Sequence, residues 1–132
     1  MRNLTKALVS ISLLAPMAVH SLGVGELKLH SALNQKLNAE ITLSLGPGEH
    51  LEDIKVALAT PDQFDKLGIT WNYFISKIQF KPIVKSNGKV VINVTSDKIL
   101  QEPILDFLLE VSWPNGEIFK EYTVLVDPPV VY

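Results

Sequence analysis

Three acidic residues that lie close together in the chain are the first candidates for chemistry. Glu49, Glu52 and Asp53 follow a Gly-Pro-Gly turn at residues 46–48. Paired carboxylates can act as general acid and general base when their surroundings separate their pKa values. A segment rich in Gly and Pro favours a solvated loop, and a calcium loop needs more densely alternating acids. We therefore interpret the three residues as a charged surface loop and as a candidate contact surface.

Other catalytic or metal-binding arrangements are not supported by the residue types and their spacing. His20, His30 and His50 have no histidine partner two or four residues away, which is the spacing of many metal sites. The sequence contains no cysteine and no Gly-x-Ser-x-Gly motif, so it offers neither a thiol nucleophile nor a nucleophile elbow. We predict that the protein is not an enzyme and that it binds no cofactor and no metal.

The segment Trp113-Pro114-Asn115-Gly116 is the sharpest local motif. An exposed tryptophan often contributes much of the energy of a protein–protein interface. The alternative is that Trp113 closes the end of a hydrophobic core above the turn. The second interpretation is favoured because Trp113 continues the apolar face of the preceding segment, and Trp113 is kept as a candidate contact residue.

These residues must be positioned by β-strands, because apolar and polar residues alternate along much of the chain. Residues 37–45 place an apolar side chain at every odd position, which is typical of a half-buried strand. The same alternation runs through 104–113 and returns through 118–126, with Pro-Asn-Gly as the turn chemistry. Pro128 and Pro129 cannot donate to a ladder and end the sheet.

A short helix is predicted between the strands. Residues 54–58 indicate a strand, and Thr60-Pro61-Asp62-Gln63 matches a helix start with a capping threonine and proline at the first helical position. The helix is expected to end at Gly68, with Phe64 and Leu67 docked on the sheet. Residues 71–75 favour another helical turn that plugs one end of the core.

A second hairpin and a flexible lead into the first strand complete the pattern. Residues 78–84 predict a strand in which Pro82 implies an edge position or a bulge, and Pro82 is therefore a candidate contact residue. Asn87-Gly88 predicts a type I′ turn, followed by a strand over 90–94 and a loop over 96–103. The segment Gly23-x-Gly25 is expected to be flexible, with the first strand at 27–29.

About seven strands with regularly spaced turns predict an all-β fold, and specifically an immunoglobulin-like β-sandwich. A partly open β-barrel is the alternative. One or two short helical turns are expected within it. Residues 22–129 are predicted to form one domain, which is long enough to bury a core without disulfides. Residues 130–132 are expected to begin a linker or to end the chain.

Residues 1–21 resemble a secretory signal peptide. Arg2 and Lys6 precede an apolar stretch that is shorter than the about 20 residues of a membrane span, and a cleavage site is expected after Ser21. The formal net charge of −2 becomes −4 when Arg2 and Lys6 are removed. An acidic domain without cysteine is a poor candidate for nucleic-acid binding and suits the bacterial periplasm.

The mature sequence closely resembles one family over almost its whole length. The matching motifs are HSALNQ with LNAEI near the start, VALATPDQFDKLGI in the middle, VTS at 94–96, and EVSWPNG with EYTVLVDPP at the end. These motifs are similar to those of the N-terminal periplasmic domain of the FimV/HubP proteins, polar hub proteins of Gram-negative bacteria. The resemblance implies no catalytic residues.

The resemblance implies a role in type IV pilus assembly, twitching motility and cell-pole organisation, with pilus or secretion assembly proteins of the periplasm or inner membrane as partners. Family members continue into a LysM peptidoglycan-binding module, a membrane helix and a cytoplasmic region with repeats, none of which is present here. The chain is therefore expected to be a fragment or a short relative, and peptidoglycan is a partner only if a LysM module follows. A free periplasmic carrier resembling a pilus chaperone is the alternative, and a small hydrolase using the acidic loop is a third hypothesis.

Overall fold

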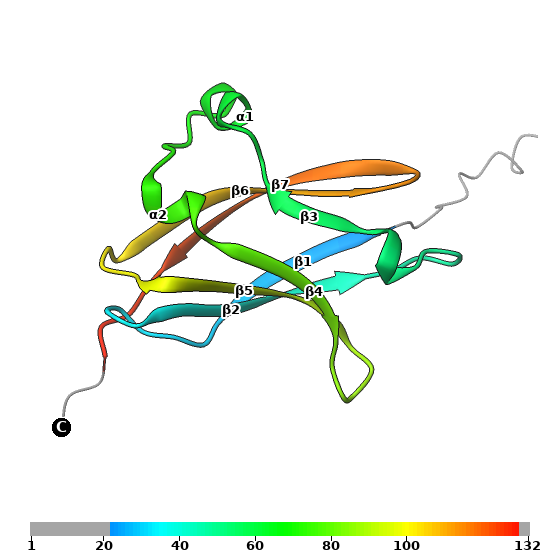
Figure 1. Cartoon of the computed structure of the whole chain (residues 1–132), viewed down its shortest axis with the longest axis horizontal. Coiled ribbons are helices and arrows are strands. Elements are labelled where there is room, and N and C mark those ends of the chain that lie inside the picture. Colours follow the sequence, from blue (N-terminus) through cyan, green and yellow to red (C-terminus); the bar gives the residue numbers. More distant parts are fainter. Residues whose placement is uncertain (1–21, 130–132) are drawn as a thin grey trace, which may run out of the picture.

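The computed structural model describes residues 22–129, which form two antiparallel β-sheets packed face to face (Figure 1). The first sheet has the strand order β1-β2-β5-β4 and the second has the order β3-β6-β7. This is the strand order of a constant-type immunoglobulin sandwich, so the predicted fold is confirmed and the barrel alternative is wrong. The strands are β1 (Gly23–Leu29), β2 (Lys36–Ser44), β3 (Lys55–Leu58), β4 (Gln79–Val84), β5 (Val90–Ile99), β6 (Ile104–Trp113) and β7 (Gly116–Leu125).

The core lies between the two sheets and is built by alternating residues, as the sequence predicts. In β2 the odd-numbered residues from Leu37 to Leu43 are buried, and the intervening polar residues face outward. In β6 the odd-numbered residues from Leu105 to Val111 are buried in the same way. Phe107 is fully buried, with its ring 5.7 Å from that of Phe80 and 5.6 Å from that of Tyr122. The rings join the two sheets, because Phe80 belongs to β4 and the other two belong to β6 and β7.

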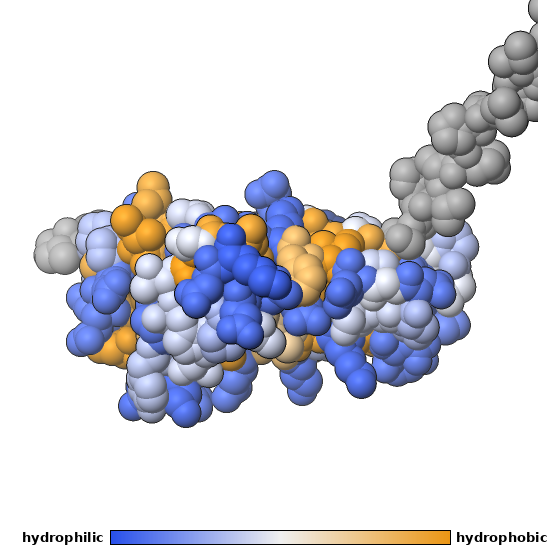
Figure 2. Space-filling view, turned by 90° about the horizontal axis from the view of Figure 1, so that it is seen from above, coloured by the Kyte–Doolittle hydropathy of each residue, from blue (hydrophilic) through white to orange (hydrophobic). Residues whose placement is uncertain are grey.

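The outer face of β6 carries a smaller apolar cluster beneath the helix α1 (Pro61–Lys66). Leu108 points to this face yet is buried, and α1 packs on β6. Phe64 is fully buried, and its ring meets that of Trp71 edge-on at 4.9 Å. The hydrophilic group near the middle of Figure 2 lies at the position of α1 in Figure 1, with hydrophobic residues to either side.

Helix α1 begins where the sequence predicts. The hydroxyl of Thr60 accepts a hydrogen bond from the backbone N–H of Gln63 at 3.3 Å, and Pro61 occupies the first helical position. Helix α1 therefore has the predicted cap. The prediction that Leu67 docks on the sheet is wrong, because 57% of Leu67 is exposed. The chain turns at Gly68, where φ is +71°, and this reversal aims Leu67 at solvent.

The second helical turn, α2 (Tyr73–Ser76), is capped by Asn72, whose side chain accepts a hydrogen bond from the N–H of Ile75 at 2.9 Å. Ile75 is buried and fills one end of the sandwich. Tyr73 and Trp71 remain partly exposed. The prediction of a buried plug at 71–75 is thus right for Ile75 and wrong for the two larger aromatic residues.

Strand β5 is longer than expected, because the predicted loop over 96–103 begins only after Ile99. Ser96 is buried, accepts a hydrogen bond from the N–H of Leu37 at 2.9 Å and donates one to the carbonyl of Lys98 at 2.6 Å. These bonds satisfy the hydroxyl at a register shift between β2 and β5. Ser96, which the sequence predicts as the start of a loop, is therefore accommodated inside the strand.

Two other local predictions are corrected by backbone geometry. Gly23 and Gly25 lie within β1 rather than in a flexible lead. Among Ser86, Asn87 and Gly88, only Gly88 has a positive φ, of +87°, whereas a type I′ turn needs two such residues. The hairpin is closed by bonds from the N–H of Gly88 to Lys85 and from the N–H of Lys85 to Lys89, which is a type I turn with a glycine bulge.

Within residues 22–129 no helix has the length and apolar character needed to cross a membrane. The predicted signal peptide at 1–21 and the predicted linker start at 130–132 lie outside the described residues.

Candidate interaction sites

Three of the five candidate contact residues line one small cavity at the end of the sandwich. Glu49, Asp53 and Trp113 surround a space of about 80 Å³, together with five neighbours. The neighbours are Gly48, His50, Ile54, Pro114 and Asn115. We call this space the hairpin-end cavity. Glu52 is exposed and does not line it, and Pro82 belongs to β4 in the other sheet.

The hairpin-end cavity forms where two turns meet. One is the acidic loop, which contains the short 3-10 helix η2 (Leu51–Asp53), and the other is the turn between β6 and β7. Glu49 stabilises its own loop, because its Oε1 accepts a hydrogen bond from the N–H of Gly46 at 2.6 Å. Gly48 adopts a φ of +78° within this loop, a conformation that glycine adopts without steric cost.

Two buried polar atoms on residues of this cavity have no hydrogen-bond partner among the described residues. They are Oε2 of Glu49, which is an acceptor, and Nε1 of Trp113, which is a donor. A buried polar group without a partner is costly, and such groups are usually satisfied by water or by a ligand. The hairpin-end cavity can therefore hold water or a small polar group that presents both a donor and an acceptor.

Trp113 packs against the core and over its own turn, as the packing interpretation expects. The residue is half-buried and lies beside the buried cluster. A Cβ atom placed on Gly116 would be 3.4 Å from Cζ2 of Trp113. The indole thus lies against Gly116, the first residue of β7, and only part of it is available for contact.

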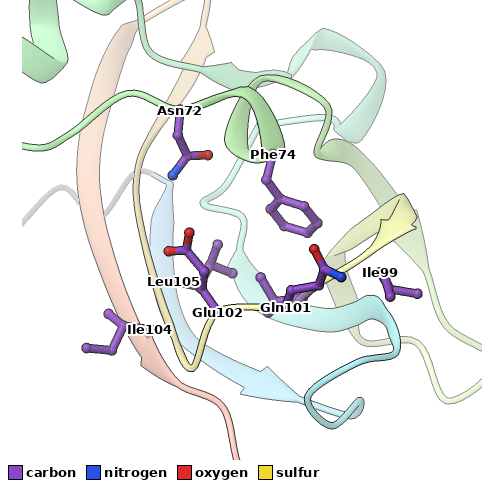
Figure 3. A pocket seen from close by; sticks show the side chains of 8 residues that line it. Asn72, Phe74, Ile99, Gln101, Glu102, Ile104 and Leu105 are labelled. Carbon is purple, nitrogen blue, oxygen red and sulfur yellow. The ribbon is translucent and has the colours of Figure 1, made fainter.

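A second cavity, lined by both apolar and polar side chains, was not predicted from the sequence. It has a volume of about 110 Å³ and lies between α2 and the connection from β5 to β6 (Figure 3). Phe74, Ile99 and Ile104 line it together with the polar side chains of Asn72, Gln101 and Glu102. The signal in the sequence is a pair of isoleucines, Ile99 within the predicted loop and Ile104 directly after it, which flank the observed connection. Both are exposed, Ile99 by 45% and Ile104 by 56%.

Charged groups are distributed unevenly over the two outer faces. On the first sheet, Lys85 Nζ lies 3.1 Å from Oε1 of Glu40, and Nε2 of His30 lies 3.4 Å from the same oxygen. The hydrogen bond from Lys85 is the main reason that the pKa of Glu40 is lowered. On the second sheet, the pKa of Glu121 is raised, chiefly by its hydrogen bond with Asp106 and then by partial burial.

Among the residues that the structure describes, the ion pairs all involve Glu40, and no group of three or more His, Asp or Glu side chains could hold a metal ion. The carboxylates of the acidic loop are likewise not gathered around one reacting position. Glu49 and Asp53 line the same cavity, whereas Glu52 points elsewhere. The geometry suits contact with another molecule better than acid–base chemistry.

Comparison with known proteins agrees with this arrangement. The profile of the FimV N-terminal domain, described as an Ig-like domain, matches residues 22–129. The chain belongs to the FimV N-terminal domain family. It is 48% identical over 134 aligned residues to the motility hub protein FimV from two strains of Pseudomonas aeruginosa. No solved structure matches it.

The match covers 98% of this chain but only 14% of the length of those FimV proteins. The shared part is therefore the FimV-type immunoglobulin-like domain. The family is one of motility hub proteins rather than of enzymes.

Proposed function

We propose that this FimV-type domain is a non-enzymatic interaction module of the periplasm that supports type IV pilus assembly, twitching motility and cell-pole organisation. The observation that carries the proposal is the family match across all described residues, together with 48% identity to a motility hub protein. The small cavities and dispersed carboxylates are consistent with contact rather than catalysis.

The proposed location is supported by residues 1–21, whose positive start and apolar stretch are typical of a signal peptide. The proposed partners are pilus or secretion assembly proteins in the periplasm or inner membrane. Peptidoglycan would be a partner only through a LysM module in a longer chain. One surface suited to contact is the hairpin-end cavity, because three of the candidate contact residues line it.

The test is an in-frame deletion of codons 22–129 that keeps the signal sequence. Loss of twitching, of surface pili or of polar positioning, with normal growth, is the expected result. Unchanged twitching, secretion and polar positioning would overturn the proposal. A reporter enzyme that is active only after export, fused after Pro129, is expected to be active, and a cytoplasmic signal would contradict the location.

A free periplasmic carrier remains the second candidate function. It is supported by the long open edge of β7, which could exchange a strand with a subunit. Stable co-purification of the free chain with a pilin-type subunit is expected for a carrier. Co-purification with membrane assembly proteins alone would favour the interaction module.

A further inference from the structure

The four sheet edges of the sandwich differ in whether they can accept another strand. An edge strand exposes a row of backbone N–H and C=O groups, and such a row is a template for pairing with an extended segment. The edges are β1 and β4 in the first sheet and β3 and β7 in the second. Each edge can be judged from its length, its register and what already occupies its backbone groups.

The β1 edge is occupied at its start. Its pairing with β2 shifts register between Val24 and Leu27. The carbonyl of Gly25 accepts hydrogen bonds from the hydroxyl of Tyr122 at 2.7 Å and from Nζ of Lys120 at 3.2 Å, and Lys120 also reaches the carbonyl of Val24. A bulge and two side chains from β7 therefore interrupt this edge at Val24 and Gly25.

The β4 edge is interrupted by proline. The bond from the N–H of Lys85 to the carbonyl of Lys89 shows that odd-numbered residues of β4 bond to β5. Even-numbered residues, including Pro82, therefore turn their backbone toward the open side. Pro82 has no N–H to offer there. The predicted edge position of Pro82 is confirmed, and its role is to prevent pairing rather than to support it.

The β3 edge is short. The strand has four residues, Lys55–Leu58, and the chain then enters helix α1 through Thr60 and Pro61. A partner strand would gain few backbone hydrogen bonds along it.

The β7 edge is the long and uninterrupted one. A two-residue turn pairs Trp113 with Gly116, and at the other end the N–H of Val126 donates to the carbonyl of Pro103 at 2.7 Å. Both pairs show that the even-numbered residues of β7 form the backbone hydrogen bonds to β6. The odd-numbered residues from Glu117 to Leu125 therefore turn their backbone N–H and C=O groups away from β6, and the sheet has no strand beyond them.

The side chains beside this edge define what would fit it. Glu117, Phe119 and Glu121 lie on the outer face, and all three are exposed. No salt bridge to Glu117 or Glu121 exists within residues 22–129. The neighbouring carboxyl of Asp106 raises the pKa of Glu121, so a cation placed beside the ionised pair would relieve their repulsion. At the end of the strand, Leu125 is 73% exposed and pairs with Ile104.

We propose that the free edge of β7 binds an extended strand of a partner protein, with Lys or Arg opposite Glu117 and Glu121 and an apolar residue opposite Phe119. A second apolar residue of that strand lies over Leu125. A second copy of this chain fits less well, because antiparallel pairing of two β7 strands centred on Glu121 would place two glutamates opposite each other.

This inference rests on the proposed interaction role and adds the chemistry of the partner. The proposed function and this inference can fail separately. A β7 edge that binds no strand, in a protein whose deletion abolishes twitching, would overturn only the inference.

The probe is a synthetic peptide of about nine residues, which spans β7 at roughly 3.3 Å per residue. It carries Val, Thr, Lys, Ile and Lys at alternate positions, with Ser between them. Titration into the isotopically labelled chain is expected to shift amide NMR signals along β7 and β6. Shifts confined to β4 or to the acidic loop, or no shifts at all, would overturn the proposal.

Charge exchange makes the test specific. The double variant Glu117→Lys/Glu121→Lys is expected to weaken binding of this peptide at least about tenfold, because like charges would then face each other. A peptide with Glu in place of both Lys residues is expected to bind the double variant better than the natural chain.

The matched control is Glu52→Lys/Asp97→Lys, which changes the net charge equally and leaves β7 intact. It is expected to bind the basic peptide within about twofold of the natural chain. An equal loss in the control would show that only net charge matters, and this result would overturn the proposal.

A backbone variant tests the edge independently of charge. Phe119→Pro removes one outward N–H, and Pro82 shows that an edge strand of this fold accepts proline at an outward position. Loss of peptide binding with an unchanged spectrum elsewhere is expected. If Phe119→Pro unfolds the protein, the charge exchange decides the question alone. Dimerisation of the natural chain through β7 would contradict the proposal.

Discussion

The two faces of β6 meet very different neighbours, although their residues alternate along a single strand. Leu105, Phe107 and Leu109 point inward and are buried against the first sheet. Asp106 and Glu110 point outward and are only half-buried, whereas Leu108 between them is buried. The inner face holds the sandwich together, whereas the outer face is packed at one place and otherwise remains available. A contact surface is expected on the face that stability does not require.

The largest expected loss of stability comes from a substitution on the inner face of β6. Phe107→Ala removes a fully buried ring that contacts Phe80 and Tyr122, and such substitutions cost about 3–5 kcal/mol in the free energy of unfolding. Chemical denaturation followed by tryptophan fluorescence measures this loss. A loss below about 1 kcal/mol would mean that the ring does not join the two sheets as described.

The outer cluster gives a smaller but still large effect. Phe64→Ala removes the buried ring beneath α1, and we expect a loss of about 3 kcal/mol, at the lower end of the range for buried aromatic residues. We also expect amides of α1 to exchange faster with deuterium, while those of β2 keep their relative protection. Leu67→Ala, directly after the same helix, is the control, and its effect is expected to stay within about 0.5 kcal/mol because the residue is exposed.

A helix cap contributes less than a buried ring. Thr60→Ala removes the hydroxyl that accepts a bond from the N–H of Gln63, and loss of such a cap costs about 1 kcal/mol. Thr60→Ser keeps the hydroxyl and is expected to retain most of the stability. Equal losses in both variants, measured by thermal unfolding, would show that the cap is not the cause.

The smallest effect is expected at the carboxylate pair, and it depends on pH. The pKa of Glu121 is raised above its ordinary value of 4.5, first by its hydrogen bond with Asp106. The folded state therefore binds the carboxyl proton of Glu121 more tightly than the unfolded state does. The stability that this proton contributes is lost as the pH rises through the raised pKa.

Asp106→Asn removes one of the two charges while keeping an oxygen that can accept from the hydroxyl of Thr123. The variant is expected to be more stable than the natural chain by a few tenths of a kcal/mol at pH 7, because the site is exposed to solvent. Below about pH 4 the two proteins should unfold alike. Denaturation curves across pH 3–8 test this, and a variant that is less stable at pH 7 would contradict the described repulsion.

The parts of the fold that depend on alternation and on capping could be predicted from the sequence. The buried odd positions of β2, the cap at Thr60 and the edge position of Pro82 follow from residue types and short spacings. Alternation places Leu108 with the polar face of its strand, and its burial depends on segments that are distant in sequence. Its apolar side chain was nevertheless a signal that this face is partly covered.

The candidate sites were harder to predict for the same reason. Glu49 and Trp113 are far apart in sequence, and only the packing of two turns brings them to one cavity. The cavity beside Phe74 depends on how α2 sits over the connection from β5 to β6. The open edge of β7 depends on strand order, which alternation alone does not define. The predictions for 96–103 and for the Asn87-Gly88 turn failed because a buried serine and a glycine bulge satisfied the backbone differently.

Amide hydrogen exchange along β7 tests the central claim most directly, because that claim is that one long edge of this FimV-type domain is left open. We predict that the amides of Phe119, Glu121 and Thr123 exchange rapidly while those of Lys120 and Tyr122 are protected. Addition of the basic peptide should then slow exchange at the first three. Strong protection of all five in the free chain would show that the edge is already covered, and would contradict the account.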